Sequence, residues 1–357
     1  MFTNSLTAPS AVSAGNANGY AIDPTWLPHS YDAPSDSFVF ARVPVETRKQ
    51  VVFLDRRFLA QAPQSPPVPV NLLRAADIET GPVHFIFHTA FCCSTLMTRA
   101  LDVPGVAAGL KEPGVLVSFA KHWSNARQTP GALNALKMTL DLLSRPGARG
   151  ETQIIKASNV ATHLLPEILH LRPDAKVLVM YSSLGGFLEA VTRRDIGGRS
   201  FARQVYQGFS NSIPLDIALS SEEQMLQTDM QIAALVWLMQ ASFFNQMQRY
   251  YGPDRIRTLS SNRFLASPAE ALANTSAFFG LNASRAQWDA VAEGDVFQEH
   301  AKERGLPFDT AKHKAQLAQA RAAHARELEV AEDWAKQIAA RCGAPLSLDD
   351  TLMSPVA

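Results

Sequence analysis

A short polar turn between an apolar run and a helical stretch is the first part of this sequence that suggests chemistry. The apolar run ends at His88, and Cys92, Cys93, Ser94 and Thr95 follow where a helix is expected to begin. Unpaired N–H groups at the start of a helix carry partial positive charge, and hydroxyl side chains add further hydrogen-bond donors. We therefore predict that these four residues bind an anion such as a phosphate.

Other interpretations of the same turn are weaker. The run HTAFCCSTLM contains neither glycine nor lysine, so it lacks the Walker A grip on a triphosphate and magnesium. His84 and His88 share a strand face with Cys92 and Cys93 close behind, but histidines in such positions more often pack in a core than bind a metal. A thiol nucleophile at the helix start is a further alternative to two buried cysteines. We expect no metal site here.

Two charged residues follow other apolar runs. Lys156 lies near the end of the run Gln153–Ala157, and Glu112 lies in a Lys-Glu-Pro sequence after Val106–Leu110. A cation at the end of a buried strand is costly unless it meets an anion, and a carboxylate nearby could remove a proton from a hydroxyl group. The simpler alternatives are a solvated glutamate and a lysine that reaches water.

The elements that would position these residues alternate between strands and helices, as in a parallel sheet covered on both faces. We expect strands at Val83–His88, Val106–Leu110, Gln153–Ala157, Lys176–Tyr181 and Arg255–Ser260. Helices are expected at Ser94–Asp102, Leu133–Ser144, Thr162–Leu171, Leu184–Arg194, Glu222–Tyr251, Ala269–Phe279, Arg285–Ala292 and Ala311–Arg341. The sequence thus predicts an α/β fold with a mostly parallel sheet.

Three regions are expected along the chain. Residues 1–75 form an N-terminal arm and a short β hairpin made of Ser37–Val43 and Gln50–Asp55. Residues 76–300 form the α/β core, and residues 301–357 form a C-terminal loop and helix packed on it. Ser220 and Glu223 predict a capping box at the start of the longest helix, and Gly252 with the following proline predicts its end.

The turn and the two charged residues resemble motifs of the sulfotransferase family, especially bacterial relatives of tyrosylprotein sulfotransferases. The resemblance covers roughly Val83–Arg194 and, more loosely, Arg255–Arg341. The family's 5′-phosphosulfate loop, [RK]-S-G-T-T-L-M, aligns with FCCSTLM, so the hydroxyl pair matches. Phe91 and Cys93 replace the basic residue and the glycine. The resemblance implies a P-loop NTPase-like sheet.

It also implies transfer of a sulfonate from 3′-phosphoadenosine 5′-phosphosulfate to a small-molecule or peptide hydroxyl acceptor, without a metal. In this alignment Glu112 corresponds to the catalytic base, and Lys156 corresponds to the lysine that neutralises the transferring sulfonate. Cys92, Cys93, Ser94 and Thr95 then hold the donor.

The family's 3′-phosphate element aligns with Ala175–Leu184, where Ser182 replaces an arginine. Ser183, or the pair Arg193 and Arg194, would have to compensate. Lys302 follows in the region where relatives bring a loop over the nucleotide. The missing basic residues also favour an alternative, a redirected or non-catalytic relative that has lost the donor site, because a fold does not imply a function.

Composition excludes several classes of partner. The 33 basic and 33 acidic residues balance, so no global field attracts nucleic acid or a membrane surface. Three cysteines form no disulfide framework, which favours a reducing cytoplasm, and the N-terminus lacks the pattern of a secretion signal. The longest apolar stretch, Ile232–Phe244, is too short to span a bilayer. Apolar positions on the long helix are compatible with a homodimer.

Overall fold

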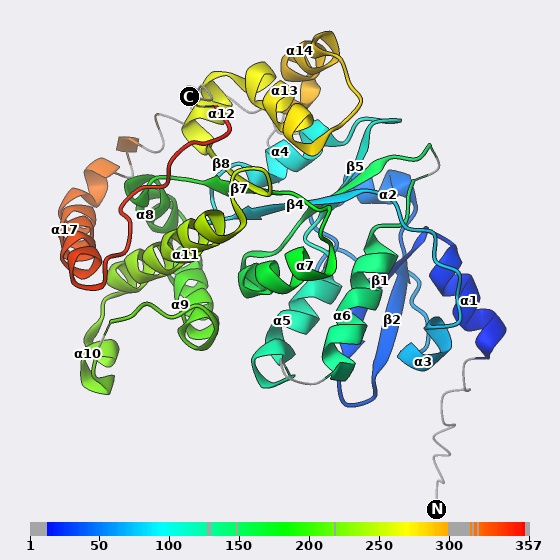
Figure 1. Ribbon diagram of the computed structural model, residues 1–357. Coiled ribbons are helices and arrows are strands. Elements are labelled where there is room, and N and C mark those ends of the chain that lie inside the picture. Colours follow the sequence, from blue (N-terminus) through cyan, green and yellow to red (C-terminus); the bar gives the residue numbers. More distant parts are fainter. Residues whose placement is uncertain are drawn as a thin grey trace, which may run out of the picture.

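The computed structural model describes residues 13–126, 130–147, 149–217, 219–298, 315, 318–319 and 321–353. Within them a five-stranded parallel sheet has the order β5-β6-β4-β7-β8 (Figure 1). The strands are β4 (Val83–His88), β5 (Ala107–Lys111), β6 (Thr152–Lys156), β7 (Val177–Tyr181) and β8 (Ile256–Ser260). Every residue of β4 and β7 is buried, as expected for strands covered on both faces. The predicted α/β fold is confirmed.

Alternate residues of the strands contribute to two separate cores. Phe85 and Phe87 of β4 belong to the larger core, and Ile86 between them belongs to the smaller one. The larger core includes α5 (Gly114–Ala126), α6 (Pro130–Leu143), α7 (Leu165–Leu171), α8 (Leu184–Arg193), α9 (Asp195–Ser212) and α11 (Asp229–Tyr251). The smaller core includes α4 (Ser94–Leu101), α12 (Ser261–Ala266), α13 (Pro268–Phe279) and α14 (Arg285–Glu293). The period of two along each strand therefore builds both layers.

The N-terminal sheet differs from the predicted hairpin. β2 (Ser37–Arg42) pairs antiparallel with β1 (Trp26–Asp32) and with the short β3 (Val68–Pro69). Gln50 ends a helix, α2 (Val45–Gln50), and no strand follows it in the predicted range. The residues between the two predicted strands form this helix because Pro44 precedes it, Glu46 lies in its first turn and basic residues lie in its last turn. Two other short helices complete this region: α1 (Ala14–Ile22) and α3 (Val70–Leu73).

The predicted helix Glu222–Tyr251 is two helices. The Ser220 and Glu223 capping box starts α10 (Ser221–Leu226) as predicted, but Thr228 and Gln231 form a second box that starts α11. Gly252, with a φ of 78°, ends α11 as predicted. Three further elements are the 3₁₀ helix η1 (Asn159–Leu164), α15 (Asp295–Gln298) and α17 (Ala325–Cys342).

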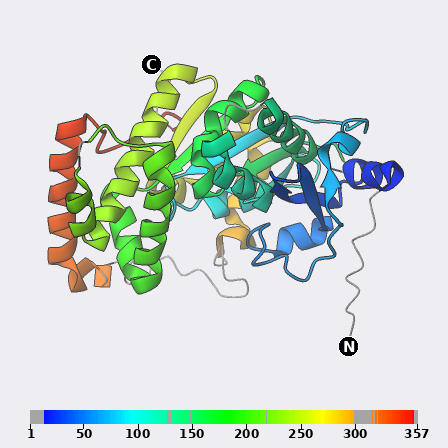
Figure 2. The same cartoon turned by 90° about the horizontal axis from the view of Figure 1, so that it is seen from below.

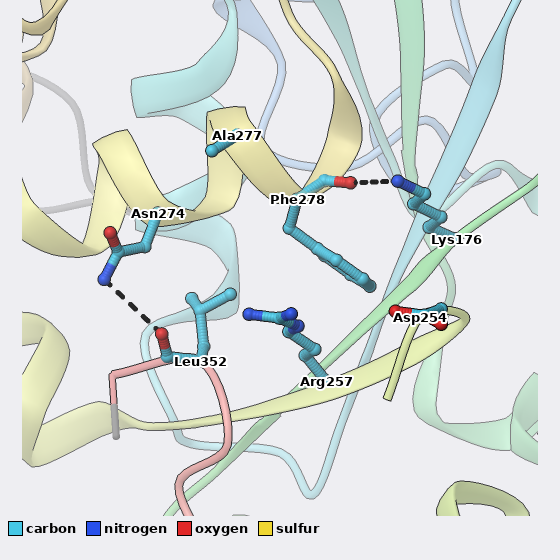
Figure 3. Close-up of a pocket in the computed structure, with 7 residues that line it drawn as sticks. All are labelled: Lys176, Asp254, Arg257, Asn274, Ala277, Phe278 and Leu352. Carbon is cyan, nitrogen blue, oxygen red and sulfur yellow. Dashed lines mark hydrogen bonds between the residues drawn. The ribbon is translucent and has the colours of Figure 1, made fainter. Parts of the chain in front are cut away.

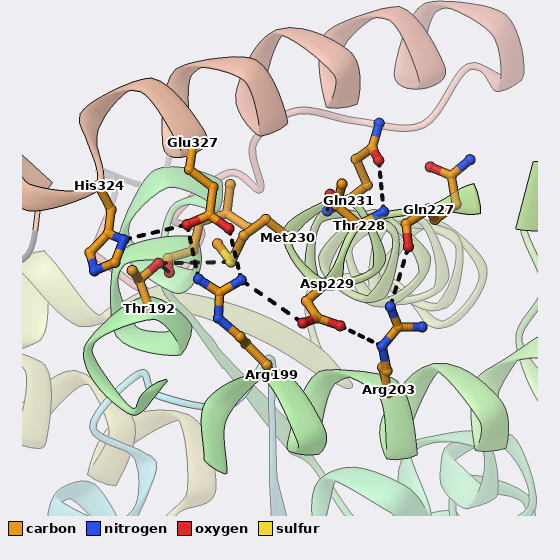
Figure 4. Close-up of polar contacts among 11 residues, drawn as sticks. Thr192, Arg199, Arg203, Gln227, Thr228, Asp229, Met230, Gln231, His324 and Glu327 are labelled. Atoms are coloured by element: carbon orange, nitrogen blue, oxygen red, sulfur yellow. Dashed lines mark hydrogen bonds and ion pairs between the residues drawn. The ribbon is translucent and has the colours of Figure 1, made fainter. Parts of the chain in front are cut away.

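Helix α17 lies at the opposite end of the molecule from the N-terminal elements (Figures 1 and 2). Its side chains Leu328, Ala331 and Ile338 are buried, and Trp334, on the same stripe of the helix, is partly buried against the larger core. Arg199 of α9 donates to both carboxylate oxygens of Glu327 at 2.7 and 2.9 Å, and it lies 3.9 Å from Asp229 of α11 (Figure 4). These ion pairs connect α17 to two core helices. Among the described residues, no helix combines the length and apolarity needed to cross a membrane.

Candidate functional site

The carboxyl ends of the central strands bring the predicted site segments to one edge of the sheet. Lys111 at the end of β5 pairs with Lys156 at the end of β6, and Lys156 pairs with Ile86 of β4. His88 at the end of β4 pairs with Met180 of β7. The chain leaves β4 toward β5 and leaves β7 toward β8, so the two neighbouring strands connect in opposite directions. Such a switch point is where open α/β sheets bind ligands.

The turn after β4 has an unusual backbone. Ala90, Phe91 and Cys93 have φ angles of 66°, 52° and 62°, in the left-handed region that favours glycine. Cys93 is the residue immediately before α4, and its side chain does not cap the helix. The turn thus keeps a left-handed conformation at the position where the sulfotransferase loop has a glycine.

Hydrogen bonds tie this turn to β7. The N–H of Thr89 donates to the carbonyl of Met180 at 3.1 Å, and the N–H of Ser182 donates to the hydroxyl of Thr89 at 3.2 Å. The thiol of Cys92 donates to the same Met180 carbonyl at 3.2 Å. Burial raises the pKa of this thiol, against smaller lowering effects of Lys156 and of hydrogen bonds from Ser94 and Thr89. A buried neutral thiol does not support the nucleophile alternative.

The hydroxyl groups predicted to hold the donor have different roles. Ser94 and Thr95 are buried in the first turn of α4, and Ser94 uses part of its hydrogen-bonding capacity on the Cys92 thiol. Ser183 caps α8, because its hydroxyl accepts from the N–H of Gly186 at 3.1 Å. The buried hydroxyl of Ser182 has no hydrogen-bond partner among the described residues.

Lys156 and Glu112 form an ion pair at this edge. The Lys156 ammonium contacts Oε1 of Glu112, and the side chains are only 2% and 13% exposed. The N–H of Glu112 also donates to the carbonyl of Lys156 at 2.8 Å. The Lys156 Nζ lies 5.3 Å from the centre of the Phe53 ring, in cation–π geometry. A nearly buried cation and a proton acceptor therefore lie side by side.

A segment of the N-terminal region holds Glu112 in place. The N–H of Leu54 donates to the carbonyl of Lys111 at 2.7 Å, and the N–H of Gly114 donates to the carbonyl of Leu54 at 2.9 Å. Glu112 lies between these two bonds with a φ of 54°. A Cβ atom at Gly114 would lie 3.0 Å from the carbonyl oxygen of His29, so a side chain here would push on the neighbouring backbone. Sequence reasoning missed Phe53 and Leu54 because it assigned them to a strand.

Left-handed residues other than glycine are concentrated here. Among the described residues six such positions occur, and four of them are Ala90, Phe91, Cys93 and Glu112. A fifth, Asp195, follows Arg194 at the junction of α8 and α9. Backbone conformations of this kind cost free energy and persist where the surrounding structure enforces them, often at functional sites. The concentration of these left-handed residues after β4 and β5 supports a functional site at this edge of the sheet.

The histidine and cysteine cluster considered from the sequence does not converge. His84 stacks on Phe279 with 4.8 Å between ring centres, and its Nδ1 accepts from the N–H of Lys176 at 3.1 Å. His88, at the other end of β4, accepts from the N–H of Ala90 through Nδ1 at 3.0 Å. Within the described ranges no three His, Cys, Asp or Glu side chains are grouped to hold a metal ion.

A cavity of about 490 Å³ lies at the opposite edge of the sheet, near the amino ends of β7 and β8. It is lined by Lys176, Asp254, Arg257, Asn274, Ala277, Phe278 and Leu352 (Figure 3). None of the predicted site residues lines it. Lys302, the last of those residues, lies outside the described part of the chain.

No protein-family model matches this sequence, and no curated protein matches it. Solved structures of sulfotransferases match this chain. The sulfotransferase domain of the Synechococcus PCC 7002 olefin synthase is 13% identical, covering 68% of this chain and 89% of its own, with a TM-score of 0.40. The sulfotransferase domain of the curacin biosynthetic pathway is also 13% identical, covering 75% and 99%, with a TM-score of 0.41.

A sulfotransferase of Mycobacterium avium is 11% identical, covering 89% of this chain and 98% of its own, with a TM-score of 0.40. Likenesses with TM-scores this low do not carry a functional argument. The function of this chain is therefore inferred from the residues of its site.

Proposed function

We propose that this protein is a sulfotransferase-like enzyme that moves a sulfonate from 3′-phosphoadenosine 5′-phosphosulfate to a hydroxyl acceptor. The observation that carries the proposal is the ion pair of Lys156 and Glu112 beside the left-handed turn that begins α4. These residues come from three separate segments. Their grouping at a switch point of the sheet supports a shared reaction site.

The proposed chemistry needs a proton acceptor and a cation within reach of one reacting group. The acceptor hydroxyl attacks the sulfur atom, a new S–O bond forms, and the bond between sulfur and the 5′-phosphate oxygen breaks. The proton of the hydroxyl passes to Glu112, and the nucleotide leaves as adenosine 3′,5′-bisphosphate. Lys156 would stabilise the negative charge that develops on the transferring sulfonate and the leaving oxygen.

The Lys156 and Glu112 pair has a physical reason to exist before substrate arrives. A buried cation without a partner would be strongly destabilising, and the carboxylate removes that penalty. A bound sulfonate would offer Lys156 a second anion and leave Glu112 facing the acceptor. The pair thus keeps both groups in reach of the reaction without a large rearrangement.

Two variants test the assignment of roles. Glu112→Gln should slow sulfonate transfer about 10²- to 10⁴-fold while binding of adenosine 3′,5′-bisphosphate stays close to wild type, because a general base acts on the acceptor. Lys156→Ala should weaken both, because the cation contacts the donor in the ground state and in the transition state. Transfer is measured as bisphosphate release with a panel of phenols and alcohols, and binding by calorimetry.

Lys176→Ala, at the opposite edge of the sheet, is the matched control and should leave both measurements unchanged. Failure of the wild-type protein to bind the bisphosphate would overturn the proposal. That result would favour the alternative of a relative without a donor site, which the replacement of basic residues by Phe91 and Ser182 suggests.

A further inference from the structure

In the turn after β4, the aromatic ring of Phe91 contacts the guanidinium of Arg194, which lies at the end of α8. The ring of Phe91 packs against Phe187 and Phe201, with ring centres 5.7 and 5.2 Å apart. The guanidinium carbon of Arg194 lies 4.1 Å from the centre of the Phe91 ring. This distance is well within the range of cation–π interaction. The turn therefore has a positive charge beside it, although its own residues carry none.

The local backbone fixes the position of Arg194. It lies where α8 ends and α9 begins, and Nη1 donates to the carbonyl of Ala190 at 2.9 Å. The next residue, Asp195, has a φ of 49°, which turns the chain sharply at this point. One planar face of the guanidinium is occupied by the Phe91 ring. The in-plane N–H donors other than Nη1 have no hydrogen bond among the described residues.

No described carboxylate forms an ion pair with Arg194 or with its neighbour Arg193. Burial and, to a smaller extent, the charge of Arg193 together lower the pKa of Arg194 to about 10. The buried Nε of Arg193 has no hydrogen-bond partner among the described residues. Arg194 is exposed to solvent and Arg193 is half-buried, so an anionic ligand could reach and stabilise these two adjacent cations.

A third observation comes from the other side of the turn. Ser182 is buried, its N–H is bound to Thr89 of the turn, and its hydroxyl has no partner among the described residues. A buried hydroxyl without a partner costs free energy unless a ligand or water satisfies it. The unsatisfied hydroxyl of Ser182 therefore belongs to a residue that is bonded to the same turn that Arg194 contacts.

We infer that Arg194 supplies, across the ring of Phe91, the positive charge that the donor-binding turn itself lacks, and that it binds a phosphate or sulfate oxygen of the nucleotide. The inference rests on the function proposed above. Phe91 has a flat ring where the sulfotransferase loop has a basic residue, and the guanidinium from the end of α8 lies over that ring. An arginine over an aromatic ring keeps its remaining N–H groups available for an anion, which a lysine cannot do as well.

The test measures binding of adenosine 3′,5′-bisphosphate by calorimetry for the wild type, Arg194→Gln and Arg194→Lys. We expect Arg194→Gln to weaken binding about 10- to 100-fold, the effect of losing one charge-assisted contact. Arg194→Lys should fall between the two, because it keeps the charge and loses the planar fork. Arg257→Gln is the matched control, since Arg257 lies 5.3 Å from the Phe278 ring at the opposite edge, and it should bind like wild type.

A relocation of the charge gives a second, independent readout. The double variant Phe91→Arg with Arg194→Gln returns the cation to the turn and should recover most of the lost affinity. Thermal unfolding of each variant verifies that the fold is intact. If the wild type binds and Arg194→Gln binds equally well, the role of Arg194 is overturned while the proposed function stands. If the wild type itself does not bind, both are overturned.

Discussion

The two edges of the parallel sheet hold their cations in different ways. At the amino edge, the guanidinium of Arg255 donates to the carbonyls of Ala175, Leu169 and Arg172 at 2.9 to 3.2 Å. Lys176 likewise donates to the carbonyl of Phe278 at 2.6 Å, at the end of α13 where helices favour a positive charge. At the carboxyl edge, Lys156 contacts a carboxylate and Arg194 lies on an aromatic ring.

The backbone shows the same contrast. Left-handed positions near the amino edge are glycines, Gly252 at the end of α11 and Gly280 at the end of α13. Those in the turn after β4 and at Glu112 are not. At the amino edge, left-handed positions are therefore occupied by glycine, which favours stability. At the carboxyl edge, several left-handed positions are occupied by other residues. Departures that cluster in this way indicate an edge kept for binding or catalysis.

The largest expected effect on stability is at the carboxyl edge. Lys156→Met leaves the Glu112 carboxylate nearly buried without its cation, which should lower the free energy of unfolding by about 3–5 kcal/mol. Adding Glu112→Gln should recover most of the loss, because both charges are then gone. Urea denaturation of the two variants and the wild type measures the difference. Simple addition of two losses would contradict a pair that is coupled in this way.

The next effect concerns pH at the amino edge. Burial lowers the pKa of His84 to about 4, so the folded protein binds fewer protons than the unfolded chain between about pH 6.5 and 4. Stability should therefore fall as the pH drops through this window, by up to about 3 kcal/mol from this group. His84→Asn should flatten the dependence measured by urea denaturation. His122→Asn, which changes an exposed histidine, should leave it unaltered.

A smaller effect is expected for a variant that should lower stability and leave nucleotide binding unchanged. Arg255→Gln removes a charged donor from three carbonyl oxygens and should lower the free energy of unfolding by about 2 kcal/mol. Binding of adenosine 3′,5′-bisphosphate should stay at the wild-type value, because Arg255 lies at the other edge. Calorimetry and denaturation are run on the same preparation. A loss of affinity equal to that of Arg194→Gln would erase the distinction between the edges.

The smallest expected effects come from substitutions at positions where the backbone is in the left-handed region. Cys93→Gly should raise the free energy of unfolding by up to about 1 kcal/mol, because glycine accepts a φ of 62° without strain. Gly280→Ala, at a φ of 70° with open space around it, should lower that free energy by about 1 kcal/mol. Thermal unfolding of both variants gives the signs. If both variants lowered the free energy of unfolding, the turn after β4 would not be strained.

Much of the fold could be predicted because it depends on local patterns. The continuous apolar runs predicted all five strands of the parallel sheet to within one residue at each end. The capping box at Ser220 was also correct, but the one at Thr228 was missed because the apolar pattern continues across the break. The hairpin failed because strand propensity in Gln50–Asp55 was outweighed by the pairing of β2 with β1. The division of the chain into regions at residues 75 and 300 stays a prediction. The sulfonate donor and the hydroxyl acceptor also stay predictions.

The sequence by itself determined which residues stand at the carboxyl ends of strands, because strand period and chain order place Glu112 and Lys156 there whatever their partners are. Only the tertiary structure decided that these two side chains pair, that Leu54 brackets Glu112, and that Arg194 lies on Phe91. Local patterns encode burial and backbone propensity. Contacts between residues far apart in the chain depend on how layers pack, and no periodicity records them.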